Sequence, residues 1–331
     1  MSTTGNQPTP HQNDPARHNA QAPRALPDQP RRGPGKALTI TAVVVAVAII
    51  AGLVVWAVND RRSDQADPAT TVRIGTTEAS ASFWPVLKEK AAQRGITVDV
   101  VNFADYTQPN QALSQGQVDL NYFQHLFFLA NYNVEKGDDL VPLSATYVVP
   151  LSLYSKKHTA LDQFGPGSVV AIPNDQTNQG RALLLLQSAG LLKLRDGGSA
   201  LSTPADVITS ASKVSVKPVD ARATVTALGG VDGSVVNNGF ARDAKIDPNS
   251  ALFADSATSS SAEPYINVFA VRAADKDKPA LRTVAEVWHD PQVVKAVVDD
   301  SQGSAVAVTG KSQADLQTIL DDLQTTIKNH S

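Results

Sequence analysis

The sequence predicts an α/β fold of two lobes, preceded by one transmembrane helix. From residue 71 onward, short strands rich in β-branched residues alternate with amphipathic helical segments, which is typical of α/β proteins with mostly parallel sheets. About 260 residues make up this part, more than a single hydrophobic core usually serves. The transmembrane helix is predicted from a run of 22 residues without a charge, at positions 37–58.

The first 70 residues divide into three expected parts. Residues 1–36 hold seven of the 20 prolines and few apolar residues, so we expect a disordered cytoplasmic tail. A helix over 37–58 would be about 33 Å long, enough to cross the cell membrane, with 59–70 as a polar tether. Basic residues precede the span, which predicts a single-pass protein with its globular part extracytoplasmic. A cleaved signal peptide is the alternative, but the leader and the apolar run are both long for one.

The strands and helices of the globular part follow from local patterns. Strands are expected where β-branched or alternating residues run, at 72–75, 96–103, 118–123, 168–172 and 233–238. Helices are expected where apolar residues recur at helical spacing, at 80–95, 109–116, 179–193, 239–245 and 315–329. Gly95 and Gly116 are positioned to end the first two of these helices.

Charge and cysteine content exclude several classes of function. Residues 1–62 hold seven Lys or Arg and three Asp or Glu, so residues 63–331 hold 22 and 29. A mildly acidic globular part gives no electrostatic reason to expect nucleic acid. The chain has no Cys, which excludes disulfides, thiol catalysis, Cys-ligated metals and a lipidated Cys. GxSxG, Walker and HExxH motifs are also missing from the sequence, so we expect a binding protein rather than an enzyme.

Four segments carry a resemblance to a known family. They are FADYTQPNQALSQGQVDLNYFQH at 103–125, SKKHTALDQF at 155–164, VAIPNDQTNQGRALLLLQSAGLLKL at 170–194 and EPYINVFAVR at 263–272. Together they resemble the NlpA/MetQ family of methionine-binding lipoproteins, over roughly residues 71–325. Members of that family are usually anchored through a lipidated Cys, so the span at 37–58 would replace that anchor here.

The resemblance implies a two-lobe periplasmic-binding-protein fold of type II-like topology, with the ligand in the interlobe cleft. The first lobe would hold 71–147 and 268–331, and the second 148–267. Tyr147–Tyr154 and Tyr265–Phe269 would form the hinge. The implied function is capture of methionine or a closely related amino acid for an ABC importer with permease and ATPase subunits. We expect a monomer without a cofactor. A membrane-tethered amino-acid sensor and a binder of a different apolar amino acid are the alternatives.

Aromatic residues are the first part of the expected site, because a thioether gains from polarizable ring walls. Five of the 18 aromatic residues lie within 122–132. By the family match, Tyr106, Phe123, His125 and Phe128 line the pocket, although each aromatic ring could instead be core. We expect His125 to bond the ligand rather than a metal, because no Asp, Glu or second His stands near it at ligand spacing.

Polar residues are the second part. A ligand carboxylate favours the planar fork of Arg, and we assign Arg181 this role in the first turn of a helix, where free amide groups also favour an anion. We expect the ligand-free fold to be indifferent to Arg181. Asn237, inside the strand SVVNN, and Asn267 match amide positions of the family, with Asn178 as a weaker candidate. Glu78 could also face the cleft.

Overall fold

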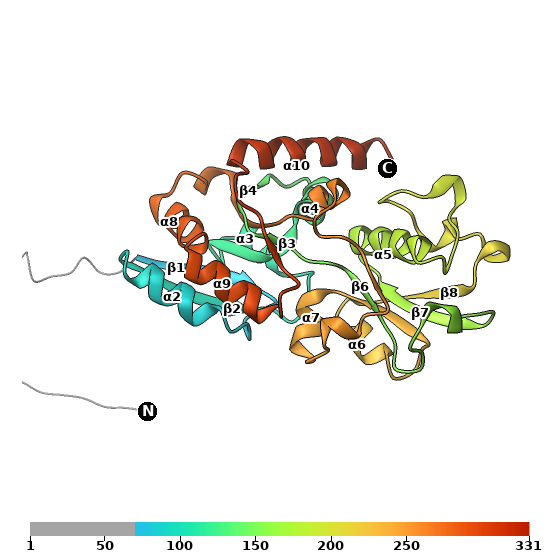
Figure 1. The fold of residues 1–331 in the computed structure, drawn as a ribbon. Helices are drawn as coiled ribbons and strands as arrows, with labels where there is room; N and C mark the ends of the chain where they lie inside the picture. The colour runs from blue at the N-terminus through green and yellow to red at the C-terminus, as the bar shows by residue number, and fades with distance from the viewer. Residues whose placement is uncertain (1–69, 331) are drawn as a thin grey trace, which may run out of the picture. The chain divides into compact units, whose positions relative to one another are not determined.

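The computed structural model describes residues 70–330, which contain two five-stranded sheets with helices packed on both faces (Figure 1). The tail at 1–36, the span at 37–58 and all of the tether at 59–70 except Thr70 lie outside the described residues. Within 70–330, every helix is too short or too polar to cross a membrane.

The first sheet combines strands from both ends of the described chain. Its order is β2 (Ile96–Asn102), β1 (Thr70–Thr76), β3 (Leu120–His125), β11 (Asn267–Arg272) and β4 (Leu140–Ala145). One face is covered by α2 (Trp84–Ala92), α8 (Pro279–Trp288) and α9 (Pro291–Asp300). The other face is covered by α3 (Pro109–Ser114), α4 (Leu126–Lys136) and α10 (Gln313–Lys328), and Figure 1 shows α10 lying along α4.

The second sheet is built from the middle of the chain. Its order is β10 (Phe253–Ala254), β6 (Ser152–Tyr154), β9 (Gly233–Val236), β7 (Ser168–Pro173) and β8 (Val214–Val219). Its two faces are covered by α5 (Gln176–Ser188) and by α6 (Ala223–Ala227) with α7 (Asn238–Asp243). The small pair of β5 (Tyr147–Val148) and β12 (Val306–Ala307) stands where the chain leaves the first sheet.

The chain passes between the two sheets twice, after β5 and again between β10 and β11. We use "first lobe" for 71–147 and 268–331 and "second lobe" for 148–267, a division that stays a prediction, as does the hinge.

The expectation of mostly parallel sheets is wrong. β1 pairs in parallel with β2 and β3, and β7 with β8 and β9, but β11 runs antiparallel to both β3 and β4. In the second sheet β6 is antiparallel to β9 and β10. β11 enters the first sheet on the way back from the second, so it has to run opposite to β3. The apolar pattern of a buried strand carries no information about this direction.

Most expected elements are present, with shifted ends. The expected helix at 80–95 begins only at Trp84, with Pro85 in its first turn, and Gly95 beyond its end has a left-handed φ of 75°. The expected strand at 118–123 occupies Leu120–His125. The helix expected at 179–193 begins at Gln176, because the Asp175 side chain caps it by accepting from Asn178 N. α4, α6, α8 and α9 were not expected.

Candidate functional site

A small chamber lies between the two sheets and brings the expected site residues together. Its free space is about 40 Å³. Its walls are formed by Glu78, Tyr106, Phe123, Gln124, His125, Phe128, Tyr147, Val149, Asn178, Arg181, Asn237, Asn238, Gly239 and Asn267. All eight residues expected from the sequence are among them, and their roles stay predictions. The free space is that of a few water molecules, so an amino acid reaches the chamber only if its walls move apart.

Strand ends place these side chains. Glu78 follows β1, His125 ends β3, and Asn237 follows β9. α5, which carries Asn178 and Arg181, begins shortly after β7. The carboxyl ends of parallel strands are the usual ligand-binding edge of an open α/β sheet. The expected place of Asn237 inside a strand is wrong, because β9 ends at Val236 and Asn237 stands at the start of α7.

One wall of the chamber is aromatic. The ring centroids of Tyr106, Phe123 and Phe128 lie 5.6–5.9 Å from one another, within range for edge-to-face and tilted ring contacts. Phe240 closes the group, 4.9 Å from Tyr106. Tyr122 is instead a core residue, 1% exposed. The aromatic run in the sequence therefore divides between core and chamber according to which side of β3 and α4 each residue occupies.

A chain of hydrogen bonds fixes the orientation of the amide groups. Asp175 Oδ1 accepts from the backbone N of Asn178 at 3.0 Å and from its Nδ2 at 2.9 Å. Asn178 Oδ1 is therefore the atom that faces the chamber, where it accepts from Asn237 Nδ2 at 2.9 Å. Asn237 Oδ1 is then left as a buried acceptor without a partner among the described residues.

His125 is neutral and its tautomer is set by the fold. It caps α4, and its Nδ1 accepts from Phe128 N at 3.1 Å. The proton is therefore on Nε2, which faces Asn178 Oδ1 at 3.4 Å. Burial, together with the charge of Arg181, lowers the pKa of His125 to about 3. Both ring nitrogens thus have protein partners, and the Nε2 bond is long enough to be exchanged for one to a ligand.

Arg181 differs from expectation in two respects. α5 begins at Gln176, so Arg181 lies beyond its first turn and the expected free amide groups beside it are not there. Its fork is also occupied: Nε donates to Asp255 Oδ2 at 2.6 Å, and Nη2 donates to Asp255 Oδ1 and Val149 O at 3.0 Å each. The guanidinium lies 4.2 Å above the Tyr265 ring. Nη1 has no hydrogen-bond partner within residues 70–330 and is free to face a ligand.

The expectation that the ligand-free fold is indifferent to Arg181 is therefore wrong. The side chain of Arg181 is 7% exposed and that of Asp255 27%. Removing the guanidinium would leave a half-buried carboxylate without its countercharge, with only the hydrogen bond from Leu151 N at 2.8 Å. Asp255 had no signal in the sequence, because its pairing with Arg181 spans 74 positions.

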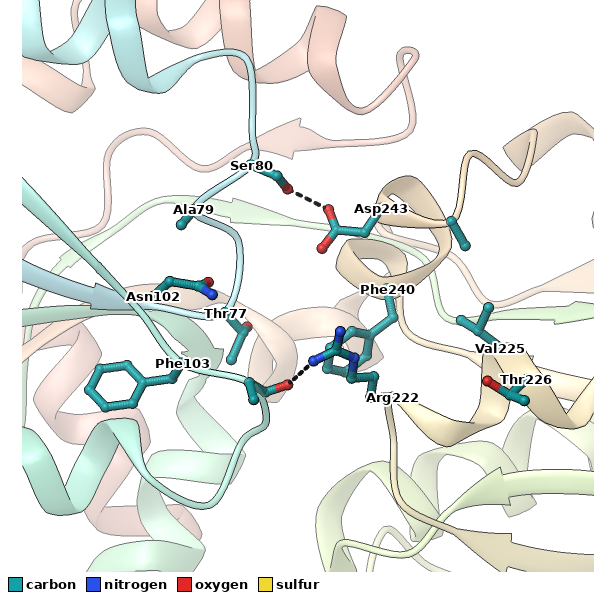
Figure 2. A pocket seen from close by; sticks show the side chains of 12 residues that line it. Thr77, Ala79, Ser80, Asn102, Phe103, Arg222, Val225, Thr226, Phe240 and Asp243 are labelled. Carbon is teal, nitrogen blue, oxygen red and sulfur yellow. Dashed lines mark hydrogen bonds between the residues drawn. The ribbon is translucent and has the colours of Figure 1, made fainter.

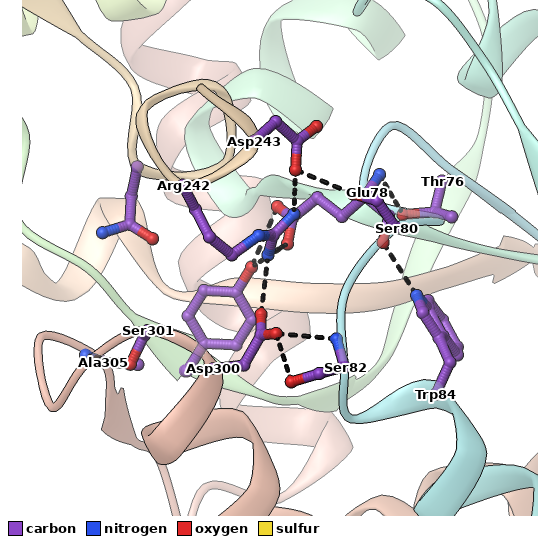
Figure 3. A network of polar contacts seen from close by, with 12 residues as sticks. Thr76, Glu78, Ser80, Ser82, Trp84, Arg242, Asp243, Asp300, Ser301 and Ala305 are labelled. Atoms are coloured by element: carbon purple, nitrogen blue, oxygen red, sulfur yellow. Dashed lines mark hydrogen bonds and ion pairs between the residues drawn. The ribbon is translucent and has the colours of Figure 1, made fainter. Parts of the chain in front are cut away.

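A second charged group, around Arg242, was also missed (Figure 3). Arg242 Nη1 lies 2.9 Å from Glu78 Oε2 and 3.1 Å from Asp300 Oδ2, and its Nη2 lies 2.9 Å from Asp243 Oδ1. Burial opposes the charge on Arg242, but the three carboxylates prevail and raise the pKa of its guanidinium. Tyr147 OH also donates to Glu78, at 3.2 Å. The Arg242 cluster, meaning these four charged residues, joins both lobes.

A larger hollow of about 570 Å³ lies beside the chamber, between the loop after β1 and α7 (Figure 2). Ser80 Oγ donates to Asp243 across it at 2.8 Å, and Arg222 Nη1 donates to Ala104 O at 3.2 Å. Arg222 and Asp243 are both exposed, so the hollow offers no buried charge to a ligand. Within 70–330, no three His, Asp or Glu side chains stand close enough together to hold a metal ion. The chamber is the better candidate site.

Comparison with known proteins identifies relatives over most of the described chain. A family model described as NlpA lipoprotein matches residues 72–309. The D-methionine-binding lipoprotein MetQ of Yersinia pestis is 36% identical over 224 residues, covering 67% of this chain and 80% of that protein.

Two solved structures show the same fold. The substrate-binding protein of a methionine transporter from Streptococcus pneumoniae is 36% identical, with a TM-score of 0.68, over 72% of this chain and 96% of that one. A nutrient-binding protein from Burkholderia cenocepacia bound to methionine is 34% identical, with a TM-score of 0.67, over 72% and 100%. The described part therefore has the mixed α/β fold of substrate-binding proteins.

The neutral state of His125 predicts a pH-dependent contribution to stability. Its folded pKa, about 3, lies below the usual value of 6.5, so the unfolded chain takes up the proton first. The stabilisation is complete above pH 6.5 and is lost as the pH falls toward 3. Between pH 7 and pH 5 the free energy of unfolding of the wild type should fall by about 1–2 kcal/mol more than that of His125→Asn.

Urea denaturation at both pH values measures this difference, in which the titration of all other groups cancels. His330→Asn is the matched control, because it removes an exposed histidine that does not line the chamber. A difference between wild type and His125→Asn that is the same at pH 7 and pH 5 would contradict the neutral assignment.

Proposed function

The chain belongs to the NlpA lipoprotein family, and from this premise we propose that it captures methionine or a closely related amino acid for an ABC importer. The observation that carries the proposal is the chamber, in which an aromatic wall stands beside a buried Arg whose Nη1 is free. The rings suit the thioether tail and the guanidinium suits the carboxylate. The names of the relatives support the same ligand class and a binding protein rather than an enzyme.

The mechanism we propose is capture by closure. The ligand enters while the lobes are apart and is enclosed when they close about the two crossing segments. In the closed form Arg181 presents Nη1, and the Asp255 carboxylate holds the guanidinium so that no side-chain freedom is lost on binding. The closed protein would then dock as a monomer on the permease subunits of the importer, whose ATPase subunits act on the cytoplasmic side.

We also propose that residues 37–58 anchor the protein in the cell membrane. The segment is uncharged and long enough to span the bilayer, and the chain has no Cys to carry a lipid. Residues 70–330 would face the outside. The alternative is a membrane-tethered sensor that uses the same chamber without a transporter. The absence of neighbouring genes for a permease and an ATPase would favour this alternative.

The ligand class is tested by thermal unfolding of residues 70–330 with a panel of small molecules. A ligand present at 100 times its dissociation constant stabilises the folded state by about 2.7 kcal/mol, which gives a clear shift in melting temperature. We expect this shift with methionine and none with sugars, phosphate or polyamines. A strong shift with another apolar amino acid and none with methionine would show that this other amino acid is the ligand. No shift with any amino acid would contradict the proposal.

The carboxylate site is tested with Arg181→Ala. Titration calorimetry should show methionine binding weakened by roughly 30-fold to a few thousand-fold, because a buried carboxylate loses its countercharge. Arg181→Lys should recover part of the affinity, since an ammonium supplies charge without the fork. Chemical denaturation should show that Arg181→Ala also lowers the free energy of unfolding by about 1–3 kcal/mol, because Asp255 loses its partner while remaining partly solvated.

Arg195→Ala is the control for the Arg181 variants. Arg195 lies beyond α5, is exposed, and donates to Ala205 O, so its removal should change affinity by no more than about twofold. Methionine binding by folded Arg181→Ala within about threefold of wild type would show that the carboxylate binds elsewhere.

The anchor is tested by fractionating cells that produce the full chain. The protein should stay with membranes after washing with high salt and carbonate, and protease added from outside should cleave the globular part. Deleting residues 37–58 should release the protein from the membrane fraction. A soluble product of the full chain that begins near Val58 would show that the segment is a cleaved signal peptide.

A further inference from the structure

The charges on the chamber walls are balanced. Among the fourteen lining residues are one carboxylate, that of Glu78, and one guanidinium, that of Arg181. His125 is neutral because burial lowers its pKa to about 3, and burial raises the pKa of Tyr106 and of Tyr147 well above the usual value. A chamber with one anion and one cation complements a ligand that carries one charge of each sign, as a free amino acid does.

Residues from both lobes fix the position of the Glu78 side chain. Its side chain is 12% exposed, and its carboxylate accepts from Tyr147 OH at 3.2 Å and from Arg242 Nη1 at 2.9 Å. Gly239 faces it across the chamber. A Cβ added at Gly239 would lie 2.9 Å from Glu78 Oε1, closer than side-chain atoms normally approach, so glycine leaves the space that the carboxylate fills.

The surroundings of Glu78 have an excess of negative charge. In the Arg242 cluster one guanidinium lies within ion-pair distance of Glu78, Asp243 and Asp300. Within residues 70–330, no second Lys or Arg makes an ion pair with any of these three carboxylates. Three anions against one cation leave a net attraction for a further positive charge, and the attraction is stronger where water is excluded.

A second acceptor lines the chamber near Gly239. Asn237 Oδ1 is buried without a partner, and Asn237 is two positions from Gly239. The hydrogen-bond chain from Asp175 through Asn178 fixes this atom as the oxygen rather than the nitrogen. A buried acceptor without a donor costs free energy, and a donor supplied by a ligand would remove that cost.

We propose that Glu78 selects ligands with a free amino group: its carboxylate, together with Asn237 Oδ1, receives the ligand ammonium, while Arg181 faces the carboxylate at the opposite end. This inference rests on the proposed function, because it names the chemistry of that same site. Arg242 and Tyr147 position Glu78, and Gly239 makes room for it. Ligands with an acylated or missing amino group would be rejected.

The test compares methionine with its analogue in which hydrogen replaces the amino group. Titration calorimetry on the wild type should show that the analogue binds at least about tenfold more weakly, a difference of about 1.4 kcal/mol. Glu78→Gln keeps the shape of the side chain and removes its charge. It should weaken methionine binding by about tenfold or more, and change binding of the analogue by less than about threefold, so that the preference for methionine is lost.

Asp300→Asn is the matched control. Asp300 shares Arg242 with Glu78 but does not line the chamber, so its loss should lower the preference for methionine by less than about threefold, against the complete loss expected for Glu78→Gln. If Glu78→Gln weakens both ligands equally, Glu78 acts only through Arg242 and the proposal is wrong. The proposal is equally wrong if the wild type binds both ligands with equal affinity. A wild type that binds no amino acid would instead contradict the proposed function itself.

Discussion

Burying charge between two sheets is costly, and the arrangement of this molecule follows from how that cost is met. A buried ion needs an opposite charge and satisfied hydrogen bonds, because desolvation alone costs several kcal/mol. Arg181 meets the requirement through Asp255, and Arg242 meets it through three carboxylates. Asp255 lies in the same lobe as Arg181 and therefore holds its guanidinium before any ligand arrives, whereas Glu78 and Asp300 meet Arg242 from the other lobe. A ligand can use only what these pairs leave over, which is Nη1 of Arg181 and the surplus negative charge beside Glu78.

A chain of hydrogen bonds fixes the polar wall of the chamber. Asp175 fixes Asn178, Asn178 fixes Asn237 and bonds His125, and His125 in turn caps α4. Each of these side chains has one orientation because its neighbour is already oriented, which lowers the entropy lost when a ligand binds. The polar wall is therefore a product of the fold, since the atoms that order it belong to the start of α5 and the start of α4.

The sequence predicted the residues that line the chamber better than the residues that hold them in place. All eight expected residues line the chamber, because strand ends and the family segments mark them locally. The ion pairs around the chamber could not be predicted: Arg181 pairs with Asp255 across 74 positions and Arg242 with Glu78 across 164, and no local pattern distinguishes Asp255 or Arg242 from a solvated surface charge. Strand direction was missed for the same reason, since β11 is antiparallel only as a result of the path taken by the whole chain. The start of α5 was misplaced because residues 176–179 are polar and show no apolar spacing, although they form the first turn of the helix that Asp175 caps.

In the proposed mechanism Glu78 takes part both in binding the ligand and in closing the lobes. The residue lines the chamber from the first lobe, and its carboxylate pairs with Arg242 on α7 of the second lobe. Asp300, also from the first lobe, holds the same guanidinium. In the proposed role a ligand ammonium would add a positive charge to a cluster with too many carboxylates, which lowers the repulsion among them. The cluster forms only when α7 meets the loop after β1 and the end of α9. A ligand that relieves its repulsion would bind the closed arrangement better than the open one, and differential affinity of that kind is what shifts a two-state equilibrium toward closure.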